Sequence, residues 1–141
     1  MSVYFDACVL VPIFVREATS DRVNTFLDSQ TSPVRVSDLG IAEVASTLSR
    51  RVREGRDTFI VARETLAAFD AWISEATIRL PVEPTDIRRA GIIVRRFDLK
   101  LLTPDAIHAA VCERLGLTLV TLDGRLADAA ARLGIAVVMP T

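Results

Sequence analysis

The sequence is poor in the residues that bind zinc or form disulfides. It has one histidine, His108, and two cysteines, Cys8 and Cys112, among 141 residues. The cysteines lie far apart, lack the paired spacing of a zinc site, and as an intracellular pair are expected to stay reduced. Neither a zinc site nor a disulfide is predicted. We interpret His108 as a packing residue on a helix face, and both cysteines as small buried side chains.

Glycine and proline are also scarce, with 6 residues of each, and no segment is low in complexity. This composition excludes a fibrous protein and argues against disorder. Hydrophobic residues make up 50% of the chain. A chain of this length can bury one core but is too short for two domains, so we expect a single domain over residues 1–141.

The chain lacks a long hydrophobic run and an excess of charge of either sign. The apolar stretch from Val3 to Val15 contains Asp6 and Pro12, has no basic leader, and is too short to span a bilayer. We therefore expect a cytoplasmic protein without a membrane anchor. The 17 basic and 18 acidic residues give a net charge of -1, which excludes a polycation that binds nucleic acid everywhere. Any contact with nucleic acid must come from a local patch.

Five short runs rich in β-branched or apolar residues predict the strands of a parallel sheet. They alternate with longer stretches of helical period, which is the pattern of α/β proteins. The runs are Val3–Phe5, Val34–Val36, Ile78–Leu80, Leu117–Thr121 and Ile135–Val138. With helices on both faces, the expected fold is a three-layer α/β/α sandwich around a central parallel sheet of about five strands.

Hydrophobic spacing and cap residues predict four helices. They cover residues 43–53, 57–76, 103–116 and 123–134. The first two are expected to pair as a helical hairpin. Asp57 is predicted as the N-cap of the second helix, and Thr103 as the N-cap of the third, with Pro104 as its first helical residue.

Four acidic residues are expected at one edge of the sheet. Asp6 and Asp123 directly follow predicted strands, and Glu43 and Asp105 lie near the starts of predicted helices. A helix joined by a short loop to a parallel strand runs antiparallel to it, so these helix starts lie at the carboxyl ends of the strands. The four carboxylates therefore converge where open α/β sheets bind ligands.

Clustered carboxylates raise one another's pKa values unless a cation lies among them. Mg²⁺ or Mn²⁺ prefers oxygen ligands and keeps positions open for a phosphate oxygen and a water molecule. Taken singly, Asp105 and Asp123 could be acids that favour a helix dipole, and Glu43 could be a solvated residue. An ordinary structural role fits Asp6 less well, because a carboxylate at the end of an apolar strand is poorly solvated. Together the four favour a metal site for phosphodiester hydrolysis.

The segments around these acids match a known family. They are YFDACVLV at 4–11, Glu43-Val44, DAIHAA at 105–110 and LVTLD at 119–123. In this order and spacing the chain resembles PIN-domain ribonucleases, specifically the VapC-type toxins of bacterial toxin–antitoxin pairs, over essentially its full length. The resemblance implies a sheet with the first strand beside the fourth. It also implies an Mg²⁺- or Mn²⁺-dependent endoribonuclease.

The resemblance also assigns roles to residues and suggests partners. Asp6, Glu43, Asp105 and Asp123 take the catalytic positions, and all of them except Glu43 are the expected metal ligands. Thr121 matches a position whose hydroxyl supports the metal site. The family usually has Ser or Thr where Cys8 stands, and a thiol is a weaker hydrogen-bond donor. The implied partners are an RNA substrate, a cognate antitoxin and a second copy of the chain in a homodimer.

Two other functions also fit parts of the pattern. A receiver-type signalling domain gathers acids at the same edge of a five-stranded sheet, but it needs an acidic pair where Ala7 and Cys8 follow Asp6. A PIN fold that binds without catalysis is the closer alternative, and the cysteine at position 8 favours it. Metal-dependent RNA cleavage that is lost on Asp6→Asn would separate these alternatives.

Four arginines, Arg50, Arg51, Arg53 and Arg56, crowd the end of the helix predicted over 43–53 and the turn after it. A rise of about 1.5 Å per residue puts that end roughly 15 Å from Glu43, so we expect the cluster to lie away from the carboxylates. We interpret it as a candidate contact for RNA or for the antitoxin. The alternative is a solvated helix end whose cations favour the dipole.

Overall fold

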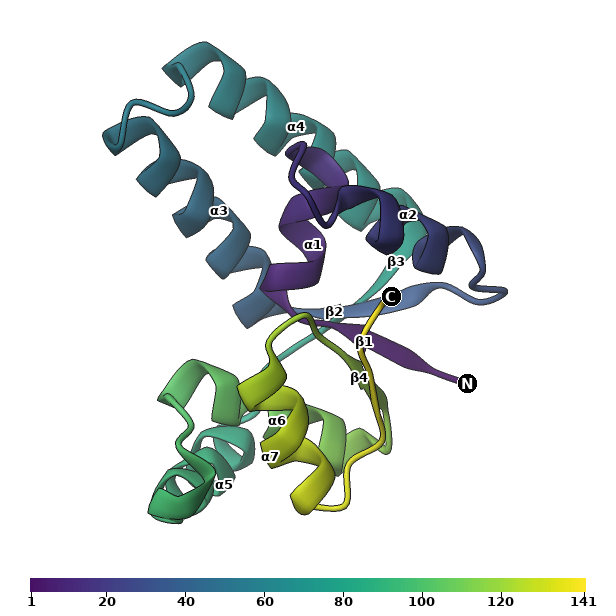
Figure 1. Cartoon of the computed structure of the whole chain (residues 1–141), viewed down its shortest axis with the longest axis vertical. Coiled ribbons are helices and arrows are strands. Elements are labelled where there is room, and N and C mark those ends of the chain that lie inside the picture. Colours follow the sequence, from purple (N-terminus) through teal and green to yellow (C-terminus); the bar gives the residue numbers. More distant parts are fainter.

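The computed structural model describes residues 1–141 and contains a parallel sheet of five strands with helices on both faces (Figure 1). The strands are β1 (Val3–Phe5), β2 (Val34–Ser37), β3 (Thr77–Leu80), β4 (Thr118–Val120) and β5 (Val137–Val138). Their order across the sheet is β3-β2-β1-β4-β5, and every neighbouring pair is parallel. All five predicted strands are confirmed, as is the pairing of the first with the fourth.

The helices are α1 (Ala7–Phe14), α2 (Ser20–Asp28), α3 (Asp38–Arg53), α4 (Phe59–Ala76), α5 (Pro84–Val94), α6 (Thr103–Leu115) and α7 (Gly124–Arg132), with a 3-10 turn η1 (Phe97–Leu99). Helices α1 to α4 cover one face of the sheet and α5 to α7 cover the other, which confirms the three-layer sandwich (Figure 1). None of these helices combines the length and the apolar character that a bilayer crossing requires. The sequence patterns had not predicted α1, α2 or α5.

Helix α3 begins earlier than the sequence pattern predicted. Its N-cap is Ser37, whose hydroxyl accepts a hydrogen bond from the backbone N–H of Gly40 at 3.1 Å. Satisfying an otherwise unpaired N–H in this way fixes the start of the helix at Asp38. Glu43 consequently lies in the second turn of α3 rather than at its beginning.

Two predicted N-caps are wrong by one residue. Helix α4 is capped by Thr58, whose hydroxyl accepts from the N–H of Val61 at 3.1 Å, and not by Asp57. Asp57 instead accepts a 2.6 Å hydrogen bond from Arg51 at the turn of the predicted α3–α4 hairpin. Thr103 is the first residue of α6, and the N-cap position is Leu102.

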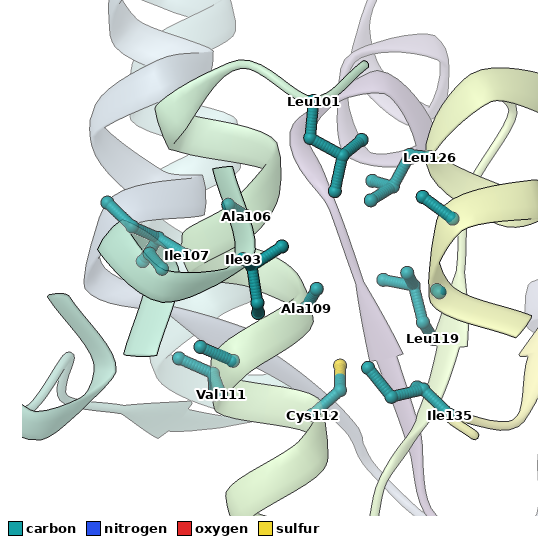
Figure 2. Close-up of a cluster of buried hydrophobic side chains, with 14 of the residues drawn as sticks. Ile93, Leu101, Ala106, Ile107, Ala109, Val111, Cys112, Leu119, Leu126 and Ile135 are labelled. Atoms are coloured by element: carbon teal, nitrogen blue, oxygen red, sulfur yellow. The ribbon is translucent and has the colours of Figure 1, made fainter. Parts of the chain in front are cut away.

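The sheet separates two hydrophobic cores. Along β1 the side chains alternate, so Val3 and Phe5 pack among α1 to α4 while Tyr4 packs toward α5 to α7. In Figure 2 the second core brings together Ile93 of α5, Leu119 of β4, Leu126 of α7 and several residues of α6. Cys112 lies in this core and is 1% exposed, as predicted for a small buried side chain.

The order of the strands decides where a site can form. From β1 the chain moves outward to β2 and then β3, whereas β4 lies on the other side of β1 and leads to β5. Strand order therefore reverses between β1 and β4. The loops that leave the carboxyl ends of two such strands diverge, and a crevice opens between them.

Candidate functional site

All four predicted acids line one cavity of about 410 Å³ at the carboxyl ends of β1 and β4. Asp6 connects β1 to α1, and Asp123 connects β4 to α7. Glu43 comes from α3 on one face of the sheet and Asp105 from the first turn of α6 on the other. Four separate segments thus supply the acids, and two of these segments follow β1 and β4, which are neighbours in the sheet.

Asp6 is the most buried of the four acids, with 4% of its surface exposed. Its Oδ2 accepts a 2.7 Å hydrogen bond from the hydroxyl of Thr121, and its Oδ1 accepts one from the thiol of Cys8 at 2.8 Å. Burial raises the pKa of Asp6, and the hydrogen bonds that it accepts from Cys8 and Thr121 offset only part of that rise. The carboxylate is held firmly but is poorly solvated.

Thr121 joins two of the acids. It is fully buried, and its hydroxyl oxygen accepts from the backbone N–H of Asp123 at 3.1 Å while its proton goes to Asp6. A short side chain with one donor and two acceptor lone pairs can serve both neighbours at once. The strand β4 thereby fixes the distance between Asp6 and the loop that carries Asp123.

Cys8 is exposed at the wall of the cavity, so its prediction as a buried side chain is wrong. Its sulfur accepts a hydrogen bond from the N–H of Leu122 at 3.3 Å and donates to Asp6. Although the residue as a whole is exposed, its sulfur lies against Asp6, Thr121 and Leu122. The resulting desolvation of the sulfur, together with the negative charge of Asp6, raises the pKa of the Cys8 thiol to about 12. The thiol therefore stays protonated and acts as a donor, as a serine hydroxyl would in the same place.

Asp123 caps helix α7. Its Oδ1 accepts from the N–H groups of Arg125 at 2.9 Å and Leu126 at 3.4 Å. The ordinary helix-capping role considered for this residue is therefore present in the structure. Its second oxygen, Oδ2, makes no hydrogen bond with the protein, so one oxygen orients the side chain and the other is available to the cavity.

Asp105 shows the repulsion among the acids. Its carboxylate makes no hydrogen bond with the protein, although it lies in the first turn of α6. Burial raises the pKa of Asp105, and the negative charges of Asp123, Asp6 and Glu43 raise it further. A cation in the cavity would relieve this repulsion.

Glu43 is tied to the only histidine. Its Oε1 lies 2.5 Å from His108 Nε2, and His108 Nδ1 lies at the same distance from the hydroxyl of Tyr4. That hydroxyl is also 2.7 Å from Ser37 Oγ. His108 is buried, as predicted, but packing is not its whole role, because both of its ring nitrogens are engaged. No spacing in the sequence connects residues this far apart.

The four arginines do not form one cluster. Arg50 lines the same cavity as the acids, so its predicted remoteness from them is wrong. Arg51 is buried and forms a 2.6 Å ion pair with Asp57, which gives it a structural role at the hairpin turn. Arg53 donates to Ser49 at 2.8 Å, and Arg56 lies 3.9 Å from an oxygen of Glu54.

The composition of the cavity wall fits a hard cation. The candidate ligands are carboxylate oxygens, and no group of three or more acidic, histidine or cysteine side chains has the geometry to hold an ion directly. Mg²⁺ binds commonly through one or two carboxylates and several water molecules, so it does not need such a closed cage. The raised pKa values of Asp6 and Asp105 indicate the same need for positive charge.

Comparison with known proteins gives a consistent result. A family model described as PIN domain matches residues 3–132. Ribonuclease VapC46 of Mycobacterium tuberculosis is 35% identical over 144 residues, a match that covers 99% of this chain and 98% of the relative.

Solved structures share the fold at lower sequence identity. The M. tuberculosis toxin VapC20, described as cleaving the sarcin–ricin loop, superposes with a TM-score of 0.77 at 19% identity and covers 99% of this chain and 100% of its own. DNA-bound VapBC from Salmonella typhimurium has a TM-score of 0.74 at 15% identity, covering 99% and 98%. VapBC2 from Rickettsia felis, bound to a DNA fragment from its promoter, has a TM-score of 0.73 at 14% identity and covers 100% of both chains.

Proposed function

The chain belongs to the PIN-domain family, and we propose that it is a metal-dependent endoribonuclease that acts as the toxin of a toxin–antitoxin pair. The observation that carries the proposal is the convergence of Asp6, Glu43, Asp105 and Asp123 on one cavity. The ribonuclease name of a relative that matches almost the whole chain supports the same reaction class. The raised pKa values of Asp6 and Asp105 support a cation as part of the working site.

The residues that would hold Mg²⁺ or Mn²⁺, one or two directly and the rest through bound water, are Asp6, Asp105 and Asp123, with Glu43 acting on the same site through water. When bound, the ion would neutralise these acids and activate a water molecule for attack on a phosphodiester. The chain's own contribution is to orient the ligands. Thr121 and Cys8 hold Asp6, and the first turn of α7 holds Asp123 by one oxygen.

The reaction proposed is hydrolysis by water attacking phosphorus in line with the departing 3′-oxygen. The P–O3′ bond breaks, so the phosphate stays on the 5′-oxygen of the downstream fragment. The water molecule gives up a proton as its oxygen bonds to phosphorus, and the departing 3′-oxygen takes up a proton to become the 3′-hydroxyl. Attack by the 2′-hydroxyl of RNA would instead give a 2′,3′-cyclic phosphate. That reaction usually relies on general acid–base residues, and the cavity has a single histidine already bonded at both nitrogens.

The ends of the RNA fragments and their dependence on metal test the proposal. With Mg²⁺ or Mn²⁺ we expect 5′-phosphate and 3′-hydroxyl ends, and EDTA should abolish cleavage until the ion is restored in excess. Fragment ends can be assigned by their susceptibility to a 5′-phosphate-dependent exonuclease and by mass spectrometry. Cyclic phosphate ends, or full cleavage in EDTA, would contradict the mechanism. RNA binding without any cleavage would favour the non-catalytic PIN-fold module.

The cavity continues along α3 toward a basic side chain. Ser46, Thr47 and Arg50 line it together with Glu43, at spacings of three, four and seven residues that place them on one face of the helix. The side chain of Arg50 is 58% exposed, and its nearest acid is Glu54 at 3.7 Å. Such an exposed pair contributes little, so the guanidinium is free to meet a phosphate. We propose that this face of α3 carries the RNA backbone toward the acids.

Arg50→Ala should weaken RNA binding at every sequence and flatten its salt dependence, because one phosphate contact and its released counterion are lost. The slope of log K against log salt should fall by about 0.7 for a single-stranded RNA. Binding should be measured in an Asp105→Asn background, which prevents cleavage.

Arg53→Ala is the matched control for Arg50→Ala. It removes the same charge from the same helix, but Arg53 donates to Ser49 and does not line the cavity. Equal effects of the two substitutions on RNA binding would contradict the proposal that this face of α3 carries the RNA backbone toward the acids. If Arg50→Ala instead loosens only the complex with the antitoxin, the basic side chain meets protein rather than RNA.

The proposed partners are an antitoxin and a second copy of the chain. The VapBC complexes among the structural relatives support an antitoxin partner. The homodimer follows from the family resemblance. Sedimentation of the isolated chain, and of the chain expressed together with the neighbouring small reading frame, would establish both.

A further inference from the structure

A chain of buried hydrogen bonds runs from the start of α3, across the sheet, and back to Glu43 on the same helix. It passes from Ser37 to Tyr4 on β1, from Tyr4 to His108 on α6, and from His108 to Glu43. Ser37 and Tyr4 are completely buried and His108 is 1% exposed. Three elements therefore meet at a side-chain network from which water is excluded, and such networks fix their members when every group is satisfied.

The partners decide the direction of each hydrogen bond. Ser37 Oγ accepts from the N–H of Gly40 at 3.1 Å, and the Tyr4 oxygen at 2.7 Å is the acceptor within reach of the Ser37 proton, so Ser37 donates to Tyr4. The Tyr4 proton then goes to His108 Nδ1, and His108 Nε2–H donates to the carboxylate of Glu43. Every hydrogen in this arrangement has an acceptor, and no acceptor faces another acceptor.

The other arrangements leave a buried group unsatisfied. With the proton on Nδ1 alone, the bare Nε2 would face the Glu43 carboxylate, and two acceptors would repel each other. With both nitrogens protonated, Tyr4 would have to donate to Ser37, and the hydroxyl proton of Ser37 would have no acceptor inside the protein. The network thus selects the neutral histidine with its proton on Nε2.

We infer that Tyr4 and His108 are positioning residues for Glu43. In this chain of hydrogen bonds each residue donates to the next, from Ser37 to Tyr4 to His108 to Glu43. The last hydrogen bond holds Glu43 Oε1 and leaves Oε2 to act in the cavity. The inference rests on the proposed function, since it assigns the network a part in the same site. Glu43 needs such help because its side chain is 31% exposed and receives no other hydrogen bond from the protein. A long side chain with free rotamers would otherwise spend much of its time away from the reacting position.

The network also explains the unusual placement of polar groups in the core. Tyr4 lies among the apolar side chains of the core between the sheet and α5 to α7, and a phenol buried there is costly unless its hydroxyl is bonded. Burial raises the pKa of Tyr4 well above its ordinary value, which keeps the hydroxyl protonated and able to donate. A core that served packing alone would be better filled by phenylalanine and leucine.

The single histidine makes the inference directly measurable. Nitrogen-15 NMR of the metal-free, RNA-free protein reports the protonation of each ring nitrogen of His108 without overlap, because the chain has only 1 histidine. We expect one protonated nitrogen, Nε2, in the wild type. We expect Tyr4→Phe, which keeps the ring but removes the donor to Nδ1, to leave the proton on Nε2, where Glu43 still requires it, and to move the Nδ1 resonance toward that of an imine nitrogen without a hydrogen bond. A wild-type spectrum with the proton on Nδ1, or on both nitrogens, would overturn the inference.

Kinetics supply the second measurement. Tyr4→Phe should lower kcat for RNA cleavage about 10- to 100-fold, the range found when groups that orient site residues are removed, with KM little changed. The control is Ser20→Ala, which removes a hydroxyl that is 2% exposed and donates to the carbonyl of Pro12, outside the network. It should leave both kcat and the His108 spectrum as in the wild type. Equal loss of kcat in the two variants would mean a general effect of lost core hydrogen bonds, and would overturn the inference.

A failure of the proposed function remains distinguishable from a failure of this inference. The spectrum is recorded without metal or RNA, so it tests the network even if the protein cleaves no RNA. If Tyr4→Phe does not fold, the wild-type spectrum still decides, because only a proton on Nε2 alone agrees with the proposed directions of the hydrogen bonds.

Discussion

Asp105→Asn is expected to lower the rate of RNA cleavage on the order of 10³-fold while making the metal-free protein more stable at neutral pH. The loss of activity follows from removing a charged oxygen ligand from the proposed metal site. The gain in stability follows from the position of Asp105, whose pKa is raised by burial and then by the charges of Asp123, Asp6 and Glu43. Asparagine has nearly the same shape and no charge to repel.

The pH dependence has a definite sign. A carboxyl group with a raised pKa in the folded state favours folding while it is protonated, and this contribution is lost as the pH rises through the folded-state pKa. Wild type and Asp105→Asn should therefore have similar stability below about pH 4 and diverge above it, with the variant more stable. Thermal unfolding in EDTA, compared between pH 4 and pH 7, measures this. Added Mg²⁺ should stabilise the wild type more than the variant.

Asp128→Asn is the matched control for Asp105→Asn. It makes the same change of charge on an exposed residue of α7 that does not line the cavity. Its activity should equal that of the wild type, and metal should stabilise both equally. Asp105→Asn that still cleaves RNA, or that is less stable than the wild type at pH 7 in EDTA, contradicts the role given to this carboxylate.

The largest loss of stability is expected outside the cavity, at Asp86→Ala, and should be about 3 kcal/mol. Asp86 is 1% exposed and accepts three hydrogen bonds: two from Arg114, at 2.8 and 2.9 Å, and one from the N–H of Glu83 at 2.8 Å. It thus caps α5 and pins this helix to α6. This loss of stability is at the low end of the range for breaking a buried ion pair. The side chain of Arg114 is 33% exposed, so water can solvate its guanidinium when Asp86 is removed.

The stability that Asp86 contributes should depend on pH in the opposite sense to that of Asp105. Burial alone would raise the pKa of Asp86, but the hydrogen bonds from Arg114 and Glu83 and the positive charge of Arg114 outweigh it, so the pKa is lowered. A lowered folded-state pKa contributes stability above the ordinary value, near 3.9, and that contribution is lost as the pH falls through the folded-state value. The gap between wild type and Asp86→Ala should therefore narrow in acid.

Denaturant unfolding at pH 7 and near pH 3 measures the difference in unfolding free energy between the wild type and Asp86→Ala, and how that difference changes with pH. Asp98→Ala is the control, because Asp98 also pairs with two arginines, Arg96 and Arg132, but its side chain is 54% exposed. Exposed pairs of this kind contribute less than about 1 kcal/mol. Equal losses in the two variants, or a gap for Asp86→Ala that does not change with pH, would show that burial of the pair is not what matters.

The helices and strands could be predicted from sequence where the pattern of residue types fits only one kind of element. The strands were predicted because each is a short apolar run, and α3 and α4 because apolar residues recur in them at helical spacing. Helices α6 and α7 were predicted from their first residues and from the glycine that follows each, Gly116 and Gly134. Helix α1 was missed because its residues, ACVLVPIF, are apolar all round and include Pro12. Nothing in such a run separates a buried helix from a strand.

Helix α5 was missed although the sequence carries its start. Glu83 and Asp86 form a capping box around Pro84, in which the Asp86 carboxylate accepts from the Glu83 N–H. An acid, a proline and a second acid three residues after the first is a recognisable N-terminal pattern. The information needed to predict the start of α5 was therefore local in the sequence.

The four acids could be placed at one edge of the sheet because their positions depend only on the topology. The position of Arg50 depends also on which face of α3 it lies on, and the role of His108 depends on its hydrogen-bond partners. Distance along the axis of α3 suggested that Arg50 was remote, but its seven-residue separation from Glu43 returns it to the same face of the helix. The sequence around His108 does not show whether this side chain only packs in the core or also forms hydrogen bonds. Its partners, 104 residues away at Tyr4 and 65 residues away at Glu43, are set only by the tertiary structure.

The pairing of β1 with β4 also has a consequence for how the chain acquires its site. Thr121 and Asp6, which bond at the end of these strands, are 115 positions apart in sequence. Contacts of such high contact order form late and slowly, because the loop between them must be ordered first. During synthesis, a growing chain that has not yet made β4 lacks Asp123, the hydroxyl that holds Asp6, and the central neighbour of β1. A chain that has not yet made β4 and Asp123 therefore cannot carry out the RNA cleavage proposed for the finished protein.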